Sequence, residues 1–283
     1  MSATAGSPQA IRRRGHVASA VGLGASGHAC WGFTGQSSFH RAALDFLADG
    51  QRMGQRLLYF SSERREDQRA VLAPLGDVDR MVERGELRLA HVGDIYDLSH
   101  PIDPKMQLAG YAAQTDQALS DGYTGLRAAA EASALVADPA RREAHVRWES
   151  IADSYMAEHP LAALCAYDEN TVPDELLTDL RCVHPACDDR RRRLPFRLAY
   201  TDADTLALEG EVDTFSAKDL QRLLRITLAE SDRAIDLQAL HFIDHRGLIA
   251  LANYSSEHAI PLTRMPPIAR RLCELLQLAV RQA

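Results

Sequence analysis

Three side chains near the start of the chain have types that could bind a ligand. His28, Cys30 and Trp31 bring an imidazole, a thiol and an indole into a stretch of four residues. An imidazole and a thiolate can ligate a metal ion or a haem iron, and all three groups can contact an organic molecule. The structural alternative is that His28 forms a local hydrogen bond while Cys30 packs as a small apolar side chain. All three interpretations stay open.

A metal site at this stretch would need further ligands. A closed zinc site takes about four ligands, of which His28 and Cys30 supply a part. Cys182, His184 and Cys187 could complete it, but their C-x-H-x-x-C spacing matches no standard zinc motif. The sequence therefore assigns no metal and leaves the cofactor unknown.

Two carboxylates follow apolar runs that are predicted to be strands. Glu63 comes after the run 57–60, and Glu131 comes after the run 125–130. Open α/β sheets bind their ligands at the carboxyl ends of their strands. If the two strands are neighbours, both carboxylates lie at one crevice, where apolar surroundings would raise their pKa values. Helix capping and exposure in a loop are the alternatives.

The segment before the first predicted helix lacks a nucleotide-binding loop. Such a loop has the sequence GxxxxGK[ST], in which backbone amides and the lysine hold the phosphates. Residues 32–41 contain Gly35 but no Gly-Lys-Ser/Thr sequence. Without the lysine, the charge on a transferred phosphoryl group is not neutralised. We therefore predict that the protein is not an enzyme, and a residual nucleotide-binding enzyme is kept as an alternative.

Alternating helical and strand-like segments must position these side chains. The first predicted helix has one apolar face and is expected to end at Gly50 and Gly54. Its face consists of Phe39, Ala42, Ala43, Phe46 and Leu47. The imidazole, thiol and indole would lie in the loop ahead of it. Strands are predicted at 57–60, 86–92, 125–130 and 161–167, with helical residues between them. This alternation predicts βαβ units and a parallel sheet.

The composition is that of an ordinary globular protein with about two domains. The chain has 283 residues, of which 46% are hydrophobic and 25% charged. Its net charge of -7 argues against nucleic-acid binding through phosphates. No apolar run is long enough to cross a bilayer or to form the core of a signal peptide. We therefore predict a cytoplasmic protein without membrane association, in which the five cysteines, lacking a CxxC pair, are reduced.

Shifts in composition divide the chain. Residues 1–25 are small, polar and rich in Gly and Ser, which predicts a disordered tail. A charged, aperiodic stretch ends near Arg193. We therefore expect one domain at 26–190, a linker at 191–195 and a second domain at 196–283.

The second domain repeats the alternation of strands and helices on a smaller scale. Strand-like residues are predicted at 198–212 in two runs, at 234–243 and at 260–264. Helices are predicted at 216–228, 247–258 and 267–280. The last of these helices is amphipathic, with an apolar face made of Ile268, Leu272, Leu275 and Leu276.

Residues 26–190 resemble the MEDS domain, a sensory module named from methanogens, methylotrophs and the dichloromethane regulator. The resemblance is carried, in the family's order, by HAC, FLADGQRMGQRLLYFSSE, GELRLAHVGDIY, QALSDGYTGLRAAAEAS and LAALCAYD. It implies a P-loop or RecA-like parallel sheet that lacks the Walker A lysine and serves as a ligand sensor. The ligands that it suggests are small hydrocarbon derivatives. We assign His28, Cys30, Trp31, Glu63 and Glu131 as candidate ligand-binding residues.

Residues 196–283 look like a STAS domain, the fold of anti-sigma-factor antagonists. The resemblance is carried by LALEGEVDTFSAKDL, AIDLQALHFIDHRGLIAL and PPIARRLCELLQL. In that family a Ser or Thr follows the Asp at a strand end and is phosphorylated by a partner kinase. Here His245 and Arg246 follow Asp244, and neither can form that phosphate ester. The candidate partner-binding residues are Asp213, Asp244, His245 and Arg246.

Together these features predict a non-enzymatic signalling regulator. The first domain would sense a small molecule, and the STAS-like domain would bind an anti-sigma factor or a kinase-like regulator without the usual phosphoserine switch. A metal- or haem-binding sensor that uses His28 and Cys30 is the alternative.

Overall fold

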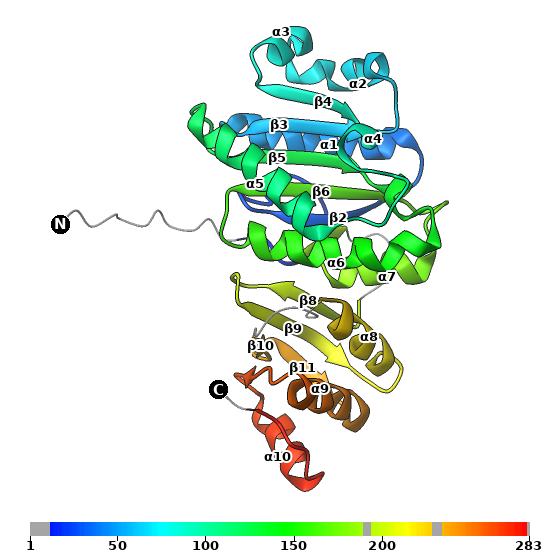
Figure 1. Cartoon of the computed structure of the whole chain (residues 1–283), viewed down its shortest axis with the longest axis vertical. Helices are drawn as coiled ribbons and strands as arrows, with labels where there is room; N and C mark the ends of the chain where they lie inside the picture. The colour runs from blue at the N-terminus through cyan, green and yellow to red at the C-terminus, as the bar shows by residue number, and fades with distance from the viewer. Residues whose placement is uncertain (1–11, 189–193, 228–233, 282–283) are drawn as a thin grey trace, which may run out of the picture.

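The structure is a computed structural model that describes residues 12–188, 194–227 and 234–281. Two sheets with their own helices follow one another along the long axis of the molecule (Figure 1). The predicted α/β class is confirmed, because the larger sheet has seven parallel strands and the smaller one is a mixed α/β sheet.

The larger sheet has the strand order β1-β7-β2-β6-β5-β3-β4, and each neighbouring pair is parallel. Helices cover both faces, so its central strands are apolar on both sides. In chain order the strands are β1 (Gly15–Val17), β2 (His28–Phe33), β3 (Arg56–Ser61), β4 (Leu87–His91), β5 (Leu126–Glu131), β6 (Leu161–Asp168) and β7 (Ala186–Asp188).

The helices divide between the two faces of this sheet. One face is covered by α1 (Gln36–Arg52), α2 (Arg65–Leu72) and α3 (Val78–Glu83), with the short 3₁₀ helix η1 (Ala73–Leu75). The other is covered by α4 (Val92–Ile95), α5 (Pro104–Ser120), η2 (Ser133–Val136), α6 (Pro139–Met156) and α7 (Asp174–Cys182).

The two long helices α5 and α6 start with the same local device. Asp103 accepts hydrogen bonds from the amides of Lys105 and Met106, and Asp138 accepts one from Ala140. In both helices a proline fills the next position, where no amide hydrogen is needed. Asp-Pro pairs therefore fix where these helices begin.

The smaller sheet is built around one long strand, β9 (Thr205–Val212). It pairs antiparallel with β8 (Phe196–Tyr200) and parallel with β10 (Ala234–Asp236) and β11 (Leu240–Ile243). Strand β12 (Leu262–Thr263) extends the sheet beside β10, and the helices are α8 (Ala217–Thr227), α9 (His245–Glu257) and α10 (Pro267–Leu275).

The two sheets share one hydrophobic core. Its buried residues run from Cys30 in the larger sheet to Cys273 in α10. Figure 1 shows α6 and α7 between the larger sheet and the smaller one. The helix α6 contacts both β8 and α8. It therefore packs on each of the two sheets.

Two segments near the N-terminus differ from the prediction. Residues 28–33 were expected in a loop, but they form the buried strand β2. Alternating Ala29, Trp31 and Phe33 side chains fill one face of the sheet, which is the pattern of a strand. Disorder was predicted for 1–25, yet β1 pairs with β7. Residues 1–11 lie outside the described part of the chain.

The C-terminal unit also departs from its predicted outline. Residues 234–243 were expected to form one strand, but they form β10 and β11, which pair with different parts of β9. Of the apolar face predicted for the last helix, Leu272 packs against the core, but Ile268 and Leu275 are 69% and 62% exposed. Of the predicted linker 191–195, residues 191–193 lie outside the described residues.

None of the helices in the described ranges combines the length and the apolar character needed to cross a membrane.

Gly50 was predicted to end the first helix, but it lies inside α1. The helix ends before Gly54, which has a φ of 72°. A Cβ atom on Gly50 would lie 2.3 Å from Cδ of Arg127, a fully buried side chain. The Arg127 guanidinium passes below the helix there and donates to the carbonyl of Gly24 at 2.7 Å and to Oε1 of Gln55 at 2.7 Å. Gly50 is therefore needed to leave room for this arginine.

We expect Gly50→Ala to destabilise the protein by about 1–3 kcal/mol, because the added methyl group displaces Arg127 from its hydrogen bonds. Gly110→Ala is the matched control. A Cβ atom on Gly110 in α5 meets nothing within 4 Å, so this change should be neutral or stabilising. Urea unfolding measures both, and similar effects of the two changes would contradict the explanation.

Candidate functional site

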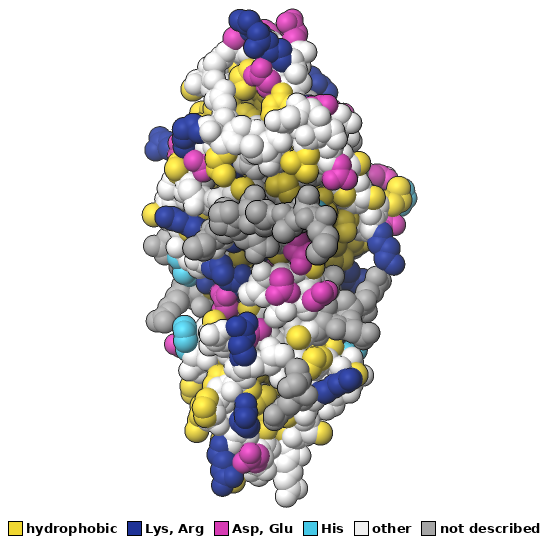
Figure 2. All heavy atoms as spheres, turned by 90° about the vertical axis from the view of Figure 1, so that its left-hand side faces the viewer, with side chains coloured by type: hydrophobic (Ala, Val, Ile, Leu, Met, Phe, Trp, Pro, Cys, Tyr) yellow, Lys and Arg dark blue, Asp and Glu magenta, His cyan; other side chains and the backbone are white. Residues whose placement is uncertain are grey.

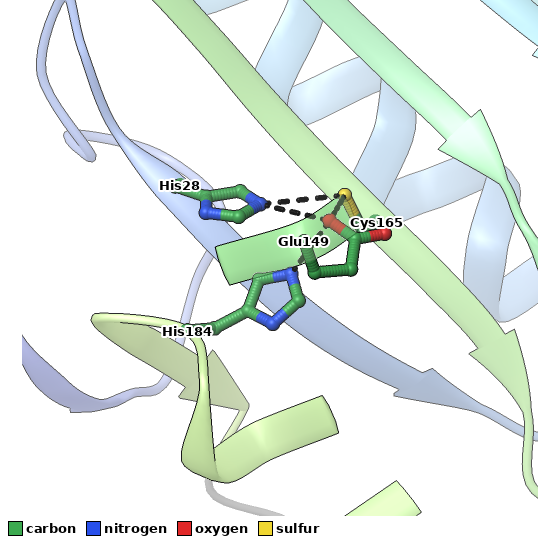
Figure 3. Close-up of side chains that lie close together, drawn as sticks. All are labelled: His28, Glu149, Cys165 and His184. Atoms are coloured by element: carbon green, nitrogen blue, oxygen red, sulfur yellow. Dashed lines mark hydrogen bonds and ion pairs between the residues drawn. The ribbon is translucent and has the colours of Figure 1, made fainter. Parts of the chain in front are cut away.

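Four side chains from separate segments meet on the α6 side of the larger sheet. They are His28 of β2, Glu149 of α6, Cys165 of β6 and His184, which follows α7 (Figure 3). Their nitrogen, oxygen and sulfur atoms all lie within 4.8 Å of one another, and none of the four residues is more than 7% exposed. We call this group the His–Glu–Cys cluster.

Strand register explains how two of these side chains meet. The strands β2 and β6 are neighbours, with His28 opposite Ala163 and Cys30 opposite Cys165. Side chains at every second position of a strand point to the same face. His28 and Cys165 therefore both point toward α6.

The Glu149 carboxylate is the centre of the cluster. Its Oε2 lies 3.2 Å from Nε2 of His28, 3.5 Å from Nε2 of His184 and 3.4 Å from Sγ of Cys165. Its Oε1 accepts a hydrogen bond of 2.9 Å from the hydroxyl of Tyr167. One carboxylate thus brings together residues from β2, β6 and the segment after α7.

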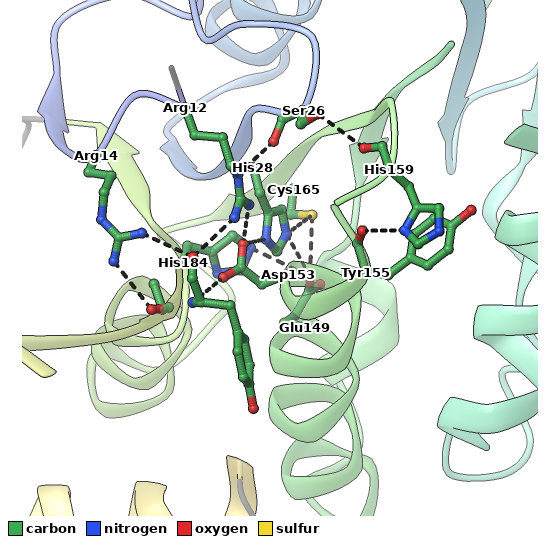
Figure 4. A network of polar contacts seen from close by, with 12 residues as sticks. Arg12, Arg14, Ser26, His28, Glu149, Asp153, Tyr155, His159, Cys165 and His184 are labelled. Atoms are coloured by element: carbon green, nitrogen blue, oxygen red, sulfur yellow. Dashed lines mark hydrogen bonds and ion pairs between the residues drawn. The ribbon is translucent and has the colours of Figure 1, made fainter. Parts of the chain in front are cut away.

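Both histidines of the cluster are oriented through their second ring nitrogen. Nδ1 of His28 lies 3.1 Å from Asp153, and Nδ1 of His184 donates to the carbonyl of Leu180 at 2.7 Å. Figure 4 shows that Asp153 is also bound by Arg12. Because each Nδ1 has a partner of its own, each Nε2 faces Glu149.

The cluster perturbs the pKa values of its members in opposite directions. Burial alone would lower the pKa of His28, but hydrogen bonds to Asp153 and Glu149 raise it above its ordinary value. Burial alone would raise the pKa of Glu149, but the neighbouring imidazoles of His145 and His28 lower it well below the usual range. An ionised Glu149 beside a protonated His28 is therefore the favoured pair.

The remaining groups are held neutral. Burial lowers the pKa of His184, and the nearby charge of His28 lowers it further. Burial raises the pKa of the Cys165 thiol, and the Glu149 carboxylate adds to this effect. His184 and Cys165 are therefore favoured as a neutral imidazole and a thiol.

An apolar cavity adjoins the cluster. It lies between the sheet and the helices α5 and α6, and its volume of about 20 Å³ is close to the space of one water molecule. Glu149 and Cys165 form part of its wall. The hydroxyl groups of Tyr96 and Tyr111 lie 3.1 Å apart beside it. The rest of the lining is Phe60, Ala128, Ala130, Ala132, Leu135, Trp148, Ala152, Met156, Leu161 and Ala163.

The five residues predicted to bind a ligand do not form one site. His28 belongs to the cluster, and Cys30 lies two positions further along the same face of β2. Trp31 packs on the opposite face, in the core under α1. Glu63 follows β3 and Glu131 is the last residue of the neighbouring strand β5, so both lie at the carboxyl edge of the sheet.

The two edge carboxylates have partners within the chain. Glu131 accepts a hydrogen bond of 2.5 Å from the hydroxyl of Ser62 and one from the amide of Ser133. Glu63 lies 2.9 Å from Nε2 of His40. Their contacts are those of residues that tie loops together at the edge of the sheet.

The sequence analysis did not include Glu149 or Cys165 among the candidate site residues. A signal was present, because His145, Glu149 and Asp153 recur every four residues, on the same side of the helix as apolar residues that are packed in the core. Such spacing places polar side chains on one face of a helix. A polar stripe on a buried helix indicates a polar network beneath it.

The predicted partner-binding residues do come together at the end of the smaller sheet. Asp213 and Asp244 follow the neighbouring strands β9 and β11, and the hydroxyl of Thr214 donates to Asp244. Asp244 also accepts hydrogen bonds from the amides of Arg246 and Gly247, both at 2.9 Å. It therefore caps α9. The side chains of His245 and Arg246 are exposed.

We expect Glu149→Gln to destabilise the protein by roughly 3–5 kcal/mol, because it leaves the buried imidazolium of His28 without one of its two anionic partners. Glu143→Gln, at an exposed position of the same helix, should change the free energy of unfolding by less than about 0.5 kcal/mol. The measurement is equilibrium unfolding in urea. Equal losses in the two variants would show that the buried charge has no special role.

A family model matches residues 27–185, and its description is MEDS, the MEthanogen/methylotroph, DcmR Sensory domain. The match covers more than half of the chain and most of the larger sheet. A search of curated proteins found no match. No family is assigned to the smaller C-terminal sheet. The chain belongs to the MEDS family.

Proposed function

We propose that this protein is a non-enzymatic signalling regulator. Its MEDS domain senses a small apolar molecule, and its C-terminal unit passes the signal to a protein partner. Membership of a sensory family supports the sensing role.

The cavity beside the cluster is the proposed ligand site. Its wall is almost entirely apolar, with the Glu149 carboxylate and the Cys165 thiol at one side. Such a wall favours a hydrocarbon or a halogenated hydrocarbon, because a charged molecule would lose its hydration there. The space is too small for such a ligand as it stands. Binding must therefore select a conformation in which α5 or α6 has moved outward.

The single observation that carries the proposal is the double contact of α6. On one side Trp148, Glu149, Ala152 and Met156 line the cavity. On the other side Asp153 accepts a hydrogen bond of 2.8 Å from the amide of Tyr200 in β8. A ligand that moves α6 changes contacts with the smaller sheet. The helix α6 thus connects the proposed ligand site with the C-terminal unit.

Further contacts join α6 to the C-terminal unit. The hydroxyl of Ser154 donates to the carbonyl of Ala203 at 3.2 Å, and Arg147 donates to the carbonyl of Ile226 at 3.3 Å. These bonds reach the β8–β9 turn and the end of α8. The link therefore involves two separate parts of the C-terminal unit.

We propose that the C-terminal unit is STAS-like and binds an anti-sigma factor or a kinase-like regulator. The proposed surface comprises Asp213, Thr214, Phe215, His245 and Arg246. Phe215 is 88% exposed, which is unusual for a large apolar side chain and supports a docking role. Because residues 245 and 246 have no hydroxyl, we propose that contact rather than phosphorylation at these positions carries the signal.

The surface charge supports a protein partner over a nucleic acid. On the face drawn in Figure 2, Lys and Arg side chains are interspersed with Asp and Glu, without a broad area of one sign. Nucleic acids bind surfaces on which positive charge is concentrated. A mixed surface of this kind does not provide that concentration.

The short connection between β2 and α1 supports a protein that does not hydrolyse nucleotides. Only Thr34 and Gly35 separate the strand from the helix. A phosphate-binding loop needs several residues whose amides surround the phosphates. This connection is too short for such a loop, which favours sensing over hydrolysis.

We expect benzene and dichloromethane, used as apolar probes, to bind beside Trp148 and change its fluorescence. The chain has two tryptophans, so Trp31→Phe leaves Trp148 as the only reporter. In that background Ala152→Leu should abolish the response by filling the cavity. Ala109→Leu, at an exposed position of α5, is the control and should retain it. An unchanged response in the Ala152→Leu variant would place the probe elsewhere and contradict the proposed site.

A further inference from the structure

We infer that His28, Glu149, Cys165 and His184 form a binding site for one transition-metal ion of the zinc type. The inference rests on geometry at the His–Glu–Cys cluster and does not depend on the identity of the sensed molecule. It differs from the site expected from the sequence, because Glu149 and Cys165 take part and Cys30 does not.

The distances between the four groups match those around a tetrahedral ion. Zinc lies about 2.0–2.3 Å from nitrogen, oxygen and sulfur ligands, so neighbouring ligand atoms are about 3.3–3.7 Å apart. From Oε2 of Glu149 the other three ligand atoms lie at 3.2, 3.4 and 3.5 Å. Sγ of Cys165 lies 3.6 Å from Nε2 of His28. Four of the six pairs of ligand atoms therefore lie close to the separation that the ion requires, and the other two pairs lie within 4.8 Å.

The Nε2 atom of His184 is placed where a bound cation would be favourable. Nδ1 of His184 donates to the carbonyl of Leu180, so in the neutral imidazole Nε2 carries a lone pair. That atom is buried and has no hydrogen-bond partner among the described residues. It faces the Glu149 carboxylate oxygen at 3.5 Å. Two electron pairs repel each other at this distance unless a positive charge lies between them.

The outer contacts are those of a metal site. Histidine ligands usually donate their other ring hydrogen to a carboxylate or a backbone carbonyl. His28 has Asp153 in this position and His184 has Leu180. Oε1 of Glu149 is already bound by Tyr167, which leaves Oε2 for the ion. Each of these three ligands is thus oriented by a separate contact.

The charges also balance when the ion is bound. A divalent ion would release the proton on His28 and the thiol proton of Cys165 to solvent. The thiolate and the Glu149 carboxylate then neutralise the ion, while Arg12 neutralises Asp153. The mixture of nitrogen, oxygen and sulfur favours zinc or cobalt over magnesium or calcium, which prefer oxygen alone.

All four ligands come from the protein and are buried, so the site is closed. Closed sites with four protein ligands are structural, whereas catalytic zinc sites keep a position for water. Two of the ligands, Glu149 and Cys165, also line the apolar cavity. An ion in the cluster would fix one wall of the cavity in place.

The test is a titration of the full-length protein, purified in the presence of a chelator, with cobalt(II). We expect one equivalent to bind and to give the visible bands of tetrahedral cobalt together with a near-ultraviolet thiolate-to-cobalt charge-transfer band. Zinc should displace the cobalt. Cys165→Ser should lose the charge-transfer band, and His184→Ala should weaken binding by at least about 10-fold.

Cys182→Ser is the matched control, since Cys182 is equally buried but lies outside the cluster. It should keep the band and the affinity. The wild-type titration decides the question even if a variant fails to fold. Binding of much less than one equivalent by the wild-type protein would overturn the inference. A charge-transfer band that survives Cys165→Ser would place the metal elsewhere and overturn it equally. Either result leaves the apolar cavity, and the fluorescence test of it, unaffected.

Discussion

The burial of the Glu149 carboxylate is the constraint on which most of this structure depends. A charge inside a protein must have hydrogen bonds and an opposite charge, because it has lost its water. Glu149 meets this demand through His28, Tyr167 and the imidazole of His145. These partners come from β2, β6 and α6 itself. A single side chain therefore fixes the relative positions of separate parts of the chain.

The same chain of contacts continues into the C-terminal unit. His28 is bound by Asp153, and Asp153 is bound in turn by Arg12 and by the amide of Tyr200. Arg12 also donates to the carbonyl of Tyr200. The segment ahead of the MEDS domain, the strand β2, the helix α6 and the first strand of the smaller sheet thus belong to one network. We propose that this network carries a change at the cavity to the C-terminal unit.

A second contact holds the two units together away from the network. Arg222 of α8 donates two hydrogen bonds of 2.6 Å to the Asp179 carboxylate in α7. Paired bonds of this kind restrict rotation as well as separation. With one contact through α6 and another through α7, the smaller sheet has a defined orientation on the larger one.

The sequence was sufficient for the elements with strong periodicity. The apolar face of Phe39 and Phe46 predicted α1, and the runs at 57–60 and 161–167 predicted β3 and β6. Strands β1 and β7 were missed because three residues are too few to show a pattern. The stretch that forms β2 was predicted to be a loop, because the side chains of His28 and Cys30 were interpreted as ligand-binding groups.

The site could be predicted only in part. The imidazole of His28 indicated a ligand-binding site near the start of the chain. The four-residue spacing of His145, Glu149 and Asp153 indicated a polar face on one helix. The contact between His28 and Cys165 joins residues 137 positions apart, and only the strand order determines it. Trp31 and His28 point to opposite faces of the sheet because they lie on the strand β2. A loop, as predicted for these residues, would not impose this separation.

Hydrogen exchange at the Tyr200 amide is the most direct test of the central claim that α6 transmits cavity occupancy to the smaller sheet. Dichloromethane should accelerate exchange in residues 196–200, because outward movement of α6 weakens the bond from Tyr200 to Asp153. Changes confined to the residues that line the cavity, with exchange in β8 unaltered, would contradict the account.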